Sequence, residues 1–401
     1  MARGATFAEA RDRAVATLDD RDRRLAHELA AGVLRRRAEL DRVLDLSRAD
    51  PRLHDVLRLG AYQLRWLTRV PAHAAVSTSV ELARETAGEA ATGYVNQALR
   101  RLEGAAGPEP APGPTHPAWL TQRWTRRFGA EAADRLIRWN DTPPPLTLQP
   151  ARWDQPVLAA RLAAAGVAVT QAPHGAGLRV PAGAPDELPG FTEGAFIVQD
   201  AAARLVCRFA ALPPGSRCYD PCAAPGGKAL ALEALGARVT AGDARRDRVV
   251  RLVENVRRAG VAIRVLCADL QAAPFANAAW DAVFLDAPCT ATGTMARHPD
   301  ARWRITPEAI GRAAARQRHL LAAAAPLVRP GGILVYATCS LEPEENEAIV
   351  EDFLTRERDF GRAPAADAVP AELRTPAGDL QTLPHRDGMD GAYAARLARA
   401  A

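Results

Sequence analysis

Two cysteines lie directly after apolar stretches that have the length of buried strands. Cys289 ends the sequence Asp286-Ala287-Pro288-Cys289, and Cys339 stands between Thr338 and Ser340. Parallel strands that lie side by side bring their carboxyl ends to one edge of a sheet, so these segments would place two thiols and a carboxylate close together. Two buried structural cysteines are the alternative, because free cysteine is among the most buried residue types. Their position at strand ends, where loops and pockets form, favours a functional pair.

A glycine-rich turn precedes these segments and has the residue types of a ligand-binding loop. It follows a short predicted strand, precedes an alanine-rich predicted helix, and consists of Cys222, Ala223, Ala224, Pro225, Gly226, Gly227 and Lys228. The glycines allow a ligand to approach bare backbone, and the N–H groups at the start of the helix point toward it. Lys228 is the only lysine among 52 Lys and Arg residues, which indicates that this position requires a compact ammonium group.

Two aspartates follow the next two predicted strands. Asp243 stands where an acidic residue binds a ribose hydroxyl in nucleotide-type sites, and Asp269 is placed to meet an adenine ring or its amino group. The turn matches neither a dinucleotide fingerprint nor a P-loop, because Gly227 and Lys228 lack the earlier glycine and the following Ser or Thr. A helix N-terminus with a ribose acid but no phosphate cradle suits S-adenosyl-L-methionine. The alternative for Asp243 is a plain helix cap on the surface.

A thiol beside a methyl donor suits methylation of a pyrimidine at carbon 5. That carbon is too poor a nucleophile to attack a sulfonium methyl group directly, but addition of a thiolate to carbon 6 activates it. An acid such as Asp286 can protonate or hydrogen-bond the ring N3 and stabilise the charge that develops there. A base must then remove the proton on carbon 5 so that the thiolate leaves. The residues alone do not decide which thiol attacks.

The elements that must position these groups lie in residues 194–401. Continuous apolar stretches at 239–242, 262–267, 282–285 and 333–337 alternate with amphipathic stretches at 247–259, 307–327 and 343–354. This alternation predicts an α/β, Rossmann-like domain with a parallel sheet covered on both faces.

The first half of the chain has a different organisation. Residues 1–105 show apolar residues at helical spacing between arginines and predict an all-α bundle. Residues 106–117 are rich in proline and glycine and predict a linker. Residues 118–193 predict a small α/β module that binds RNA, and within it residues 119–139 have the pattern of a helix. The arginine-studded faces of the bundle can lie along RNA phosphates, although such a face is more often simply solvated.

The composition bounds these interpretations. The chain of 401 residues is 48% hydrophobic and 25% charged, which is typical of a globular protein. Its formal net charge of +5 fits a polyanionic partner without requiring one. No apolar stretch approaches the length of a membrane span and residues 1–10 lack a signal-peptide core, so we expect a cytoplasmic protein with no membrane partner. None of the six cysteines forms a CxxC pair, so we expect free thiols and no metal.

The loop 222–228, Asp-Ala-Pro-Cys at 286–289 and Thr-Cys-Ser at 338–340 together resemble the RsmB/NOP family of RNA (cytosine-5) methyltransferases. The resemblance implies that Cys339 attacks carbon 6 and that Cys289 assists release of the product. It also implies that residues 222–228, Asp243, Asp269 and Asp286 surround S-adenosyl-L-methionine. DNA cytosine methyltransferases use the thiol of the Pro-Cys motif as nucleophile, but the second cysteine here and the lack of a Glu-Asn-Val motif downstream argue against that branch.

The resemblance extends over nearly the whole chain. Segments 59–64, 71–76 and 93–100 are similar to the NusB-type RNA-binding domain, and segments 194–203 and 297–300 also match the family. The architecture implies a cytosine in 16S ribosomal RNA as the target. We further expect free RNA or an early assembly intermediate as the substrate, and a monomeric protein. Residues 290–293 and 387–393 depart from the family pattern, which bears on substrate fit.

Two other functions remain open. The same chemistry on transfer RNA is one, although the tRNA-acting relatives generally lack the N-terminal bundle. An RNA-binding assembly factor that has lost catalysis is the other, and the presence of both Cys289 and Cys339 argues against it.

Overall fold

The computed structural model describes residues 7, 10, 14–103 and 115–401. The chain forms two compact units: unit 1 comprises Met1–Thr142 and Ala296–Arg304, and unit 2 comprises Pro143–Met295 and Ile305–Ala401. Most of the predicted linker at 106–117 lies outside the described residues, and the predicted domain boundaries stay predictions. None of the described helices combines the length and apolar character that crossing a membrane requires.

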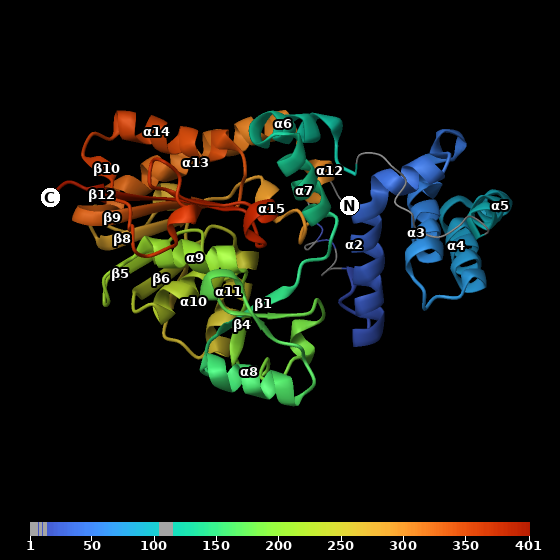
Figure 1. The fold of residues 1–401 in the computed structure, drawn as a ribbon, viewed down its shortest axis with the longest axis horizontal. Coiled ribbons are helices and arrows are strands. Elements are labelled where there is room, and N and C mark those ends of the chain that lie inside the picture. The colour runs from blue at the N-terminus through green and yellow to red at the C-terminus, as the bar shows by residue number, and fades with distance from the viewer. Residues whose placement is uncertain (1–6, 8–9, 11–13, 104–114) are drawn as a thin grey trace. The chain divides into compact units, whose positions relative to one another are not determined.

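Among its described residues, unit 1 contains helices joined by turns and loops, and no strand (Figure 1). The long helix α2 begins after Asp19, whose carboxylate accepts a hydrogen bond from the Asp22 amide and caps the helix. Apolar side chains such as Leu40, Leu57 and Leu99 are completely or almost completely buried and form the core of the bundle. The helices are α2 (Asp20–Val43), α3 (His54–Trp66), α4 (Ala72–Ala87), α5 (Thr92–Glu103), α6 (Ala118–Phe128), α7 (Ala130–Asn140) and α12 (Ala301–Arg304).

The helix predicted over residues 119–139 is two helices. Gly129 separates α6 from α7 with a φ of +85°, a conformation that residues with a side chain rarely adopt. Both helices are amphipathic, which is why the periodicity runs through the break, and Trp124 and Leu136 are completely buried.

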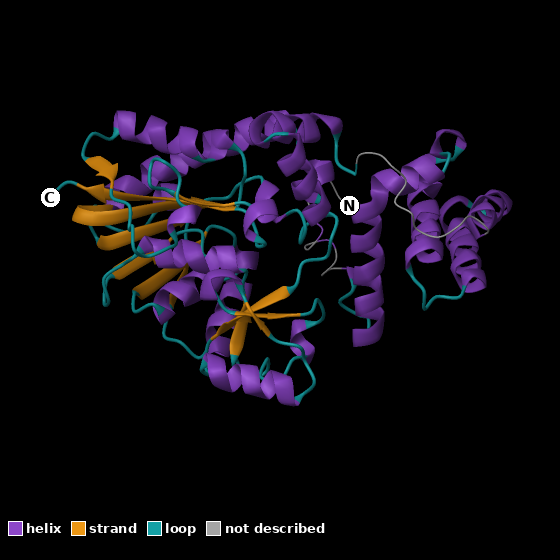
Figure 2. Cartoon of the chain, viewed as in Figure 1, coloured by secondary structure: helices purple, strands orange, loops and turns teal. Residues whose placement is uncertain are grey.

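Unit 2 contains a small sheet that is separate from its large sheet (orange in Figure 2). The small sheet has four antiparallel strands in the order β2-β3-β1-β4. Leu148, Leu158, Leu178 and Phe196 form its core against one helix. The elements are β1 (Leu146–Pro150), α8 (Gln155–Ala164), β2 (Thr170–Gln171), β3 (Leu178–Val180) and β4 (Phe196–Val198).

The large sheet of unit 2 has the order β10-β12-β9-β8-β5-β6-β7, with β11 paired to β12. Strands β7, β6, β5, β8 and β9 are parallel, as predicted, whereas β12 and β10 extend the sheet in antiparallel fashion. The strands are β5 (Arg217–Asp220), β6 (Arg238–Asp243), β7 (Arg264–Cys267), β8 (Trp280–Asp286), β9 (Val328–Thr338), β10 (Phe360–Arg362), β11 (Leu380–Thr382) and β12 (Ala392–Arg399).

Helices cover both faces of this sheet (Figure 1). Successive strand residues point to opposite faces, so Phe284 packs in one core cluster and Leu285 in the other. One face carries α9 (Ala201–Ala210), α10 (Gly227–Ala234) and α11 (Arg246–Ala259), and the other carries α13 (Pro307–Ala324) and α14 (Glu347–Arg356). The predicted α/β Rossmann-like class is confirmed.

Candidate active site

The two thiols singled out from the sequence lie side by side at the carboxyl edge of the large sheet. β8 and β9 are parallel neighbours, with Asp286 opposite Ala337. The Sγ atoms of Cys289 and Cys339 are 3.3 Å apart, and both residues are half-buried. Proximity to Cys339, through a hydrogen bond between the two sulfurs, together with burial raises the pKa of the Cys289 thiol well above its ordinary value. Cys289 therefore holds its proton at neutral pH.

An ion pair stands beside the thiols. Lys228 Nζ lies 2.7 Å from Asp286 Oδ2, and both side chains are largely buried. Burial alone would lower the pKa of the Lys228 ammonium, but the Asp286 carboxylate outweighs it and raises that pKa above the usual lysine value. The proximity of Cys339 acts in the same direction. The one lysine of the chain is therefore a fixed positive charge at this edge.

The loop 222–228 folds as a tight turn that leads into α10. The Ala223 amide donates to the Gly242 carbonyl at 2.8 Å, which ties the loop to the end of β6. Gly226 has a φ of +111° and caps α10, so the first N–H groups of that helix face the loop. The peptide between Ala224 and Pro225 is cis.

Asp243 and Asp269 stand at the ends of the next two strands. Asp243 is buried and its Oδ1 accepts a hydrogen bond from the Arg245 amide at 2.9 Å. Asp269 is exposed and its Oδ1 accepts from the Gln271 amide at 3.0 Å. Both residues lie at the predicted edge of the sheet, and no hydrogen bond or ion pair among the described residues joins either of them to the thiols.

Asp220, the last residue of β5, was not among the site residues predicted from the sequence. This carboxyl group is completely buried, its Oδ1 accepts from the Cys222 amide at 3.2 Å, and its Oδ2 has no partner among the described residues. Burial raises the pKa of Asp220 well above its ordinary value, and the Asp286 carboxylate adds to the shift. The available signal was a carboxylate at the end of the short predicted strand that leads into the loop 222–228.

The other cysteines differ from the pair. Cys207 on α9 and Cys218 on β5 are completely or almost completely buried in the core. Burial raises the pKa of Cys207 to about 12. Burial also raises the pKa of Cys222, although this thiol belongs to the predicted cofactor loop. Cys267 is exposed on β7. Cys289 and Cys339 are thus the two neighbouring thiols at the sheet edge.

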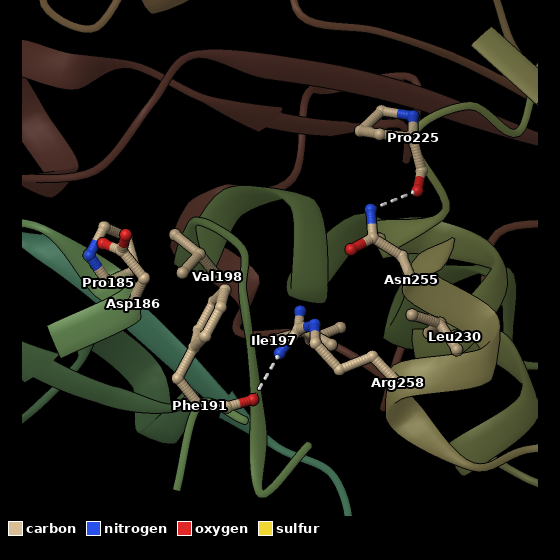
Figure 3. A pocket seen from close by; sticks show the side chains of 10 residues that line it. Pro185, Asp186, Phe191, Ile197, Val198, Pro225, Leu230, Asn255 and Arg258 are labelled. Carbon is tan, nitrogen blue, oxygen red and sulfur yellow. Dashed lines mark hydrogen bonds between the residues drawn. The ribbon is translucent and has the colours of Figure 1, made fainter. Parts of the chain in front are cut away.

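A cavity of about 410 Å³ is lined in part by Pro225 and Gly227 of the loop 222–228 (Figure 3). Arg258 stacks over the Phe191 ring at 4.4 Å and donates to the Phe191 carbonyl, while Asn255 Nδ2 donates to the Pro225 carbonyl at 2.9 Å. The cavity is lined by Pro185, Asp186, Phe191, Ile197, Val198, Pro225, Gly227, Leu230, Asn255 and Arg258. Neither thiol lines it, so it is distinct from the edge that holds the cysteine pair.

The fold, together with the loop 222–228 and the thiol pair at the carboxyl edge of the large sheet, is that of a Rossmann-like, S-adenosyl-L-methionine-dependent methyltransferase. The family description "16S rRNA methyltransferase RsmB/F" matches residues 210–398, "NusB family" matches residues 1–103, and "RsmF/B-like, ferredoxin-like domain" matches residues 116–184. Two relatives named ribosomal RNA small subunit methyltransferase B come from Pseudomonas putida and Vibrio cholerae. The first is 36% identical over 96% of this chain and 92% of its own length, and the second 34% identical over 94% and 90%. The chain therefore belongs to the RsmB/F family of ribosomal RNA small subunit methyltransferases.

Solved structures agree with the fold. The crystal structure of PH0851 has a TM-score of 0.80 and 25% identity and covers 96% of this chain and 92% of its own. NSun6 from Pyrococcus horikoshii, solved with SFG, has a TM-score of 0.63 and 20% identity over 71% of this chain and 98% of its own, a likeness of fold alone.

The residues at the sheet edge fit the predicted methyl donor. The N–H groups at the start of α10 suit its carboxylate, and the unpartnered Oδ2 of buried Asp220 suits its ammonium group. Asp243, at the end of β6, suits the ribose hydroxyls.

Proposed function

We propose that this protein transfers a methyl group from S-adenosyl-L-methionine to carbon 5 of a cytosine in 16S ribosomal RNA through a covalent bond between Cys339 and carbon 6. The observation that carries the proposal is the pair of thiols 3.3 Å apart beside the Lys228–Asp286 ion pair. The names of the relatives support ribosomal RNA of the small subunit as the substrate class. We further propose that the protein acts as a cytoplasmic monomer on free RNA or an early assembly intermediate.

The reaction starts with attack by Cys339. Reacting as a thiolate, its Sγ bonds to carbon 6 of the cytosine, and the electron pair of the ring double bond moves to carbon 5, which attacks the methyl group. A base then takes the proton from carbon 5, the ring double bond re-forms, and the sulfur–carbon bond breaks. The products are 5-methylcytosine, S-adenosylhomocysteine, the Cys339 thiolate and the protonated base. S-adenosyl-L-methionine supplies the electrophilic methyl group when bound.

Cys289 is proposed to assist in the last step. The raised pKa of Cys289 keeps its thiol protonated, and its S–H can donate a hydrogen bond to the sulfur of Cys339. This contact stabilises the leaving thiolate when the covalent bond to carbon 6 breaks. Removing Cys289 should therefore leave attack intact and slow release.

Asp286 and Lys228 are proposed to hold the polar edge of the cytosine as a pair. Paired with the Lys228 ammonium, Asp286 presents a carboxylate, which can accept from the exocyclic amino group of cytosine. The hydrogen bond to N3 that the sequence analysis gave to Asp286 needs a proton. Lys228, 2.7 Å from Asp286 Oδ2, supplies a donor at this position.

The test uses unmodified 16S ribosomal RNA, S-adenosyl-L-methionine and three proteins: the parent, Cys289→Ala and Cys339→Ala. Each mixture is run on a denaturing protein gel, and its RNA is scored for 5-methylcytosine. Cys289→Ala is expected to accumulate a covalent protein–RNA adduct, and Cys339→Ala is expected to give neither adduct nor product. An adduct with Cys339→Ala would exchange the two roles. If the parent methylated a parallel sample of transfer RNA but not the ribosomal RNA, transfer RNA would be the substrate. If the parent bound RNA and S-adenosyl-L-methionine but transferred no methyl group, the protein would be a binding factor without catalysis.

A further inference from the structure

Glu345 is a completely buried carboxylate next to the cysteine pair, and no step above uses it. It lies in the short helical turn Pro343–Glu345, just before α14. Oε1 accepts from the hydroxyls of Thr290 and Ser340, the latter at 2.6 Å. Oε2 accepts from the Thr290 amide and from Gln317 Nε2, each at 2.9 Å. Four donors therefore hold both oxygens, which is how a buried carboxylate remains tolerable.

These donors tie together the two loops that carry the thiols. Thr290 follows Cys289 directly, and Ser340 follows Cys339 directly. One carboxylate thus joins the residue after each cysteine. Gln317 on α13 also donates to the Pro288 carbonyl at 3.0 Å, so the Cys289 loop is held on both sides of the cysteine.

The backbone that carries Glu345 is itself anchored. The Tyr336 hydroxyl donates to the Glu345 carbonyl at 2.5 Å. Asn346 Nδ2 donates to the Ser340 carbonyl at 2.8 Å, and the Thr338 hydroxyl donates to Asn346 Oδ1 at 2.5 Å. Tyr336 and Thr338 belong to β9, so the carboxylate has a fixed position relative to the strand that leads to Cys339.

We propose that Glu345 is a positioning residue that sets the separation of the Cys289 and Cys339 sulfur atoms by binding Thr290 and Ser340 at once. Its catalytic consequence rests on the two-thiol reaction proposed above, whereas its effect on the separation of the sulfurs does not. Its charge also faces Cys289 and contributes to the raised pKa of that thiol, behind the hydrogen bond with Cys339 and burial. A neutral amide cannot replace it, because an NH₂ group at either oxygen position would face donors.

The first test measures the separation of the sulfurs without substrate. Diamide oxidises two thiols to a disulfide and is itself reduced to the hydrazine, and the reaction is fast only when the two sulfurs can meet in a narrow geometry. Glu345→Gln is compared with the parent and with Glu344→Gln, which makes the same change on the neighbouring residue. Mass spectrometry of tryptic peptides follows the Cys289–Cys339 disulfide. We expect Glu345→Gln to form it about 10-fold more slowly and Glu344→Gln to match the parent.

The second test measures catalysis and binding separately. Since a displacement of about 1 Å can cost about 100-fold in rate, kcat of Glu345→Gln should fall by a factor of that order. Calorimetric binding of S-adenosyl-L-methionine should stay within about twofold of the parent, because Glu345 lies in a different loop from residues 222–228. Cross-linking and kcat both at the parent's level would overturn the proposal. Slower cross-linking in a system whose parent transfers no methyl group would uphold positioning and reject the proposed function.

A milder variant covers the case in which Glu345→Gln does not fold. Thr290→Val keeps the shape of the side chain and the amide donor but removes the hydroxyl that Glu345 binds. It should slow cross-linking by less than Glu345→Gln and retain the thermal unfolding temperature within a few degrees. If Thr290→Val cross-links like the parent, Glu345 does not act through this loop and the proposal fails.

Discussion

At the residue scale, Asp220 combines full burial with an oxygen that no described residue satisfies. Such a group costs stability in the free protein, because an unpaired polar atom has lost its water. In the cofactor site proposed here, a ligand ammonium group would pair with this oxygen and favour the ionised carboxylate. The unpartnered buried oxygen therefore accounts for both the cost in stability and the proposed binding role. The dependence of stability on pH tests the cost in stability.

Asp220→Asn should remove a dependence of stability on pH. Burial raises the pKa of Asp220 above the value of about 3.9 that an aspartate has in the unfolded chain. At a pH between these two pKa values, Asp220 is protonated in the folded protein and ionised in the unfolded chain. This contribution to stability is present below the unfolded pKa and is lost as pH rises toward the folded pKa. The unfolding temperature of the parent minus that of Asp220→Asn should therefore fall as the pH rises above about 4. A constant difference would contradict a raised pKa.

Asp281 provides a control of opposite sign. Arg217 and Arg329 donate to its carboxylate and lower its pKa below the usual range, with Arg217 the larger influence. A lowered pKa contributes stability that is present above the unfolded pKa and is lost as pH falls through the folded pKa. The parent minus Asp281→Asn difference should therefore rise with pH up to about pH 5 and then stay level.

At the scale of elements, the turn between β5 and α10 depends on Gly226. Its φ of +111° is strained for any other residue, and an added Cβ would approach Leu252 Cδ1 at 2.9 Å. The turn places the first N–H groups of α10, so a distortion here would act on the proposed site of the methyl donor.

Gly226→Ala should lower stability by about 1–3 kcal/mol and weaken binding of S-adenosyl-L-methionine. Calorimetric titration and thermal unfolding measure the two effects. Gly311→Ala is the matched control, since Gly311 lies within α13 with nothing near the added Cβ, and it should be neutral or stabilising by up to about 1 kcal/mol. Unchanged donor affinity in Gly226→Ala would separate this turn from the binding site.

The elements that the sequence predicts well are those whose pattern is local. The strands that end at Asp286 and Thr338 are apolar stretches, and their parallel pairing follows from the helix between them. The antiparallel strand β12 was not predicted, because arginines interrupt its apolar residues. The site divides in the same way: spacing identifies the loop 222–228 and both thiols. The contact between Lys228 and Asp286 could not be predicted, because 58 positions separate them in the sequence. Glu345 lies in a polar stretch that predicts only the start of a helix.

At the scale of the whole molecule, a short segment of unit 1 lies in the sequence between the two parts of unit 2. The segment Ala296–Arg304 follows the loop of Cys289 in sequence and belongs to unit 1, where Arg302 is completely buried. Arg302 Nη1 lies 2.6 Å from Asp141 Oδ1, and Nη2 donates to the Asn140 carbonyl at 2.7 Å. Trp303 Nε1 donates to the Leu34 carbonyl at 2.7 Å. No local pattern marks this segment as part of a helical core, so the sequence analysis could not place it.

Arg302→Met should destabilise unit 1 of the full chain by about 3–5 kcal/mol, because it leaves the Asp141 carboxylate without its buried partner. Adding Asp141→Asn removes that unpaired charge and should restore part of the loss, so the double variant should be more stable than Arg302→Met alone. Denaturant unfolding of the parent, Arg302→Met, Asp141→Asn and the double variant gives the coupling energy between the two residues.

Arg138→Met is the control, since Arg138 forms an exposed ion pair with Asp134 on α7. This substitution should change stability by less than about 1 kcal/mol. Equal stability of Arg302→Met and the parent would show that the segment does not hold unit 1 together. The destabilisation expected instead would make the segment that follows the Cys289 loop a structural part of the NusB-containing unit.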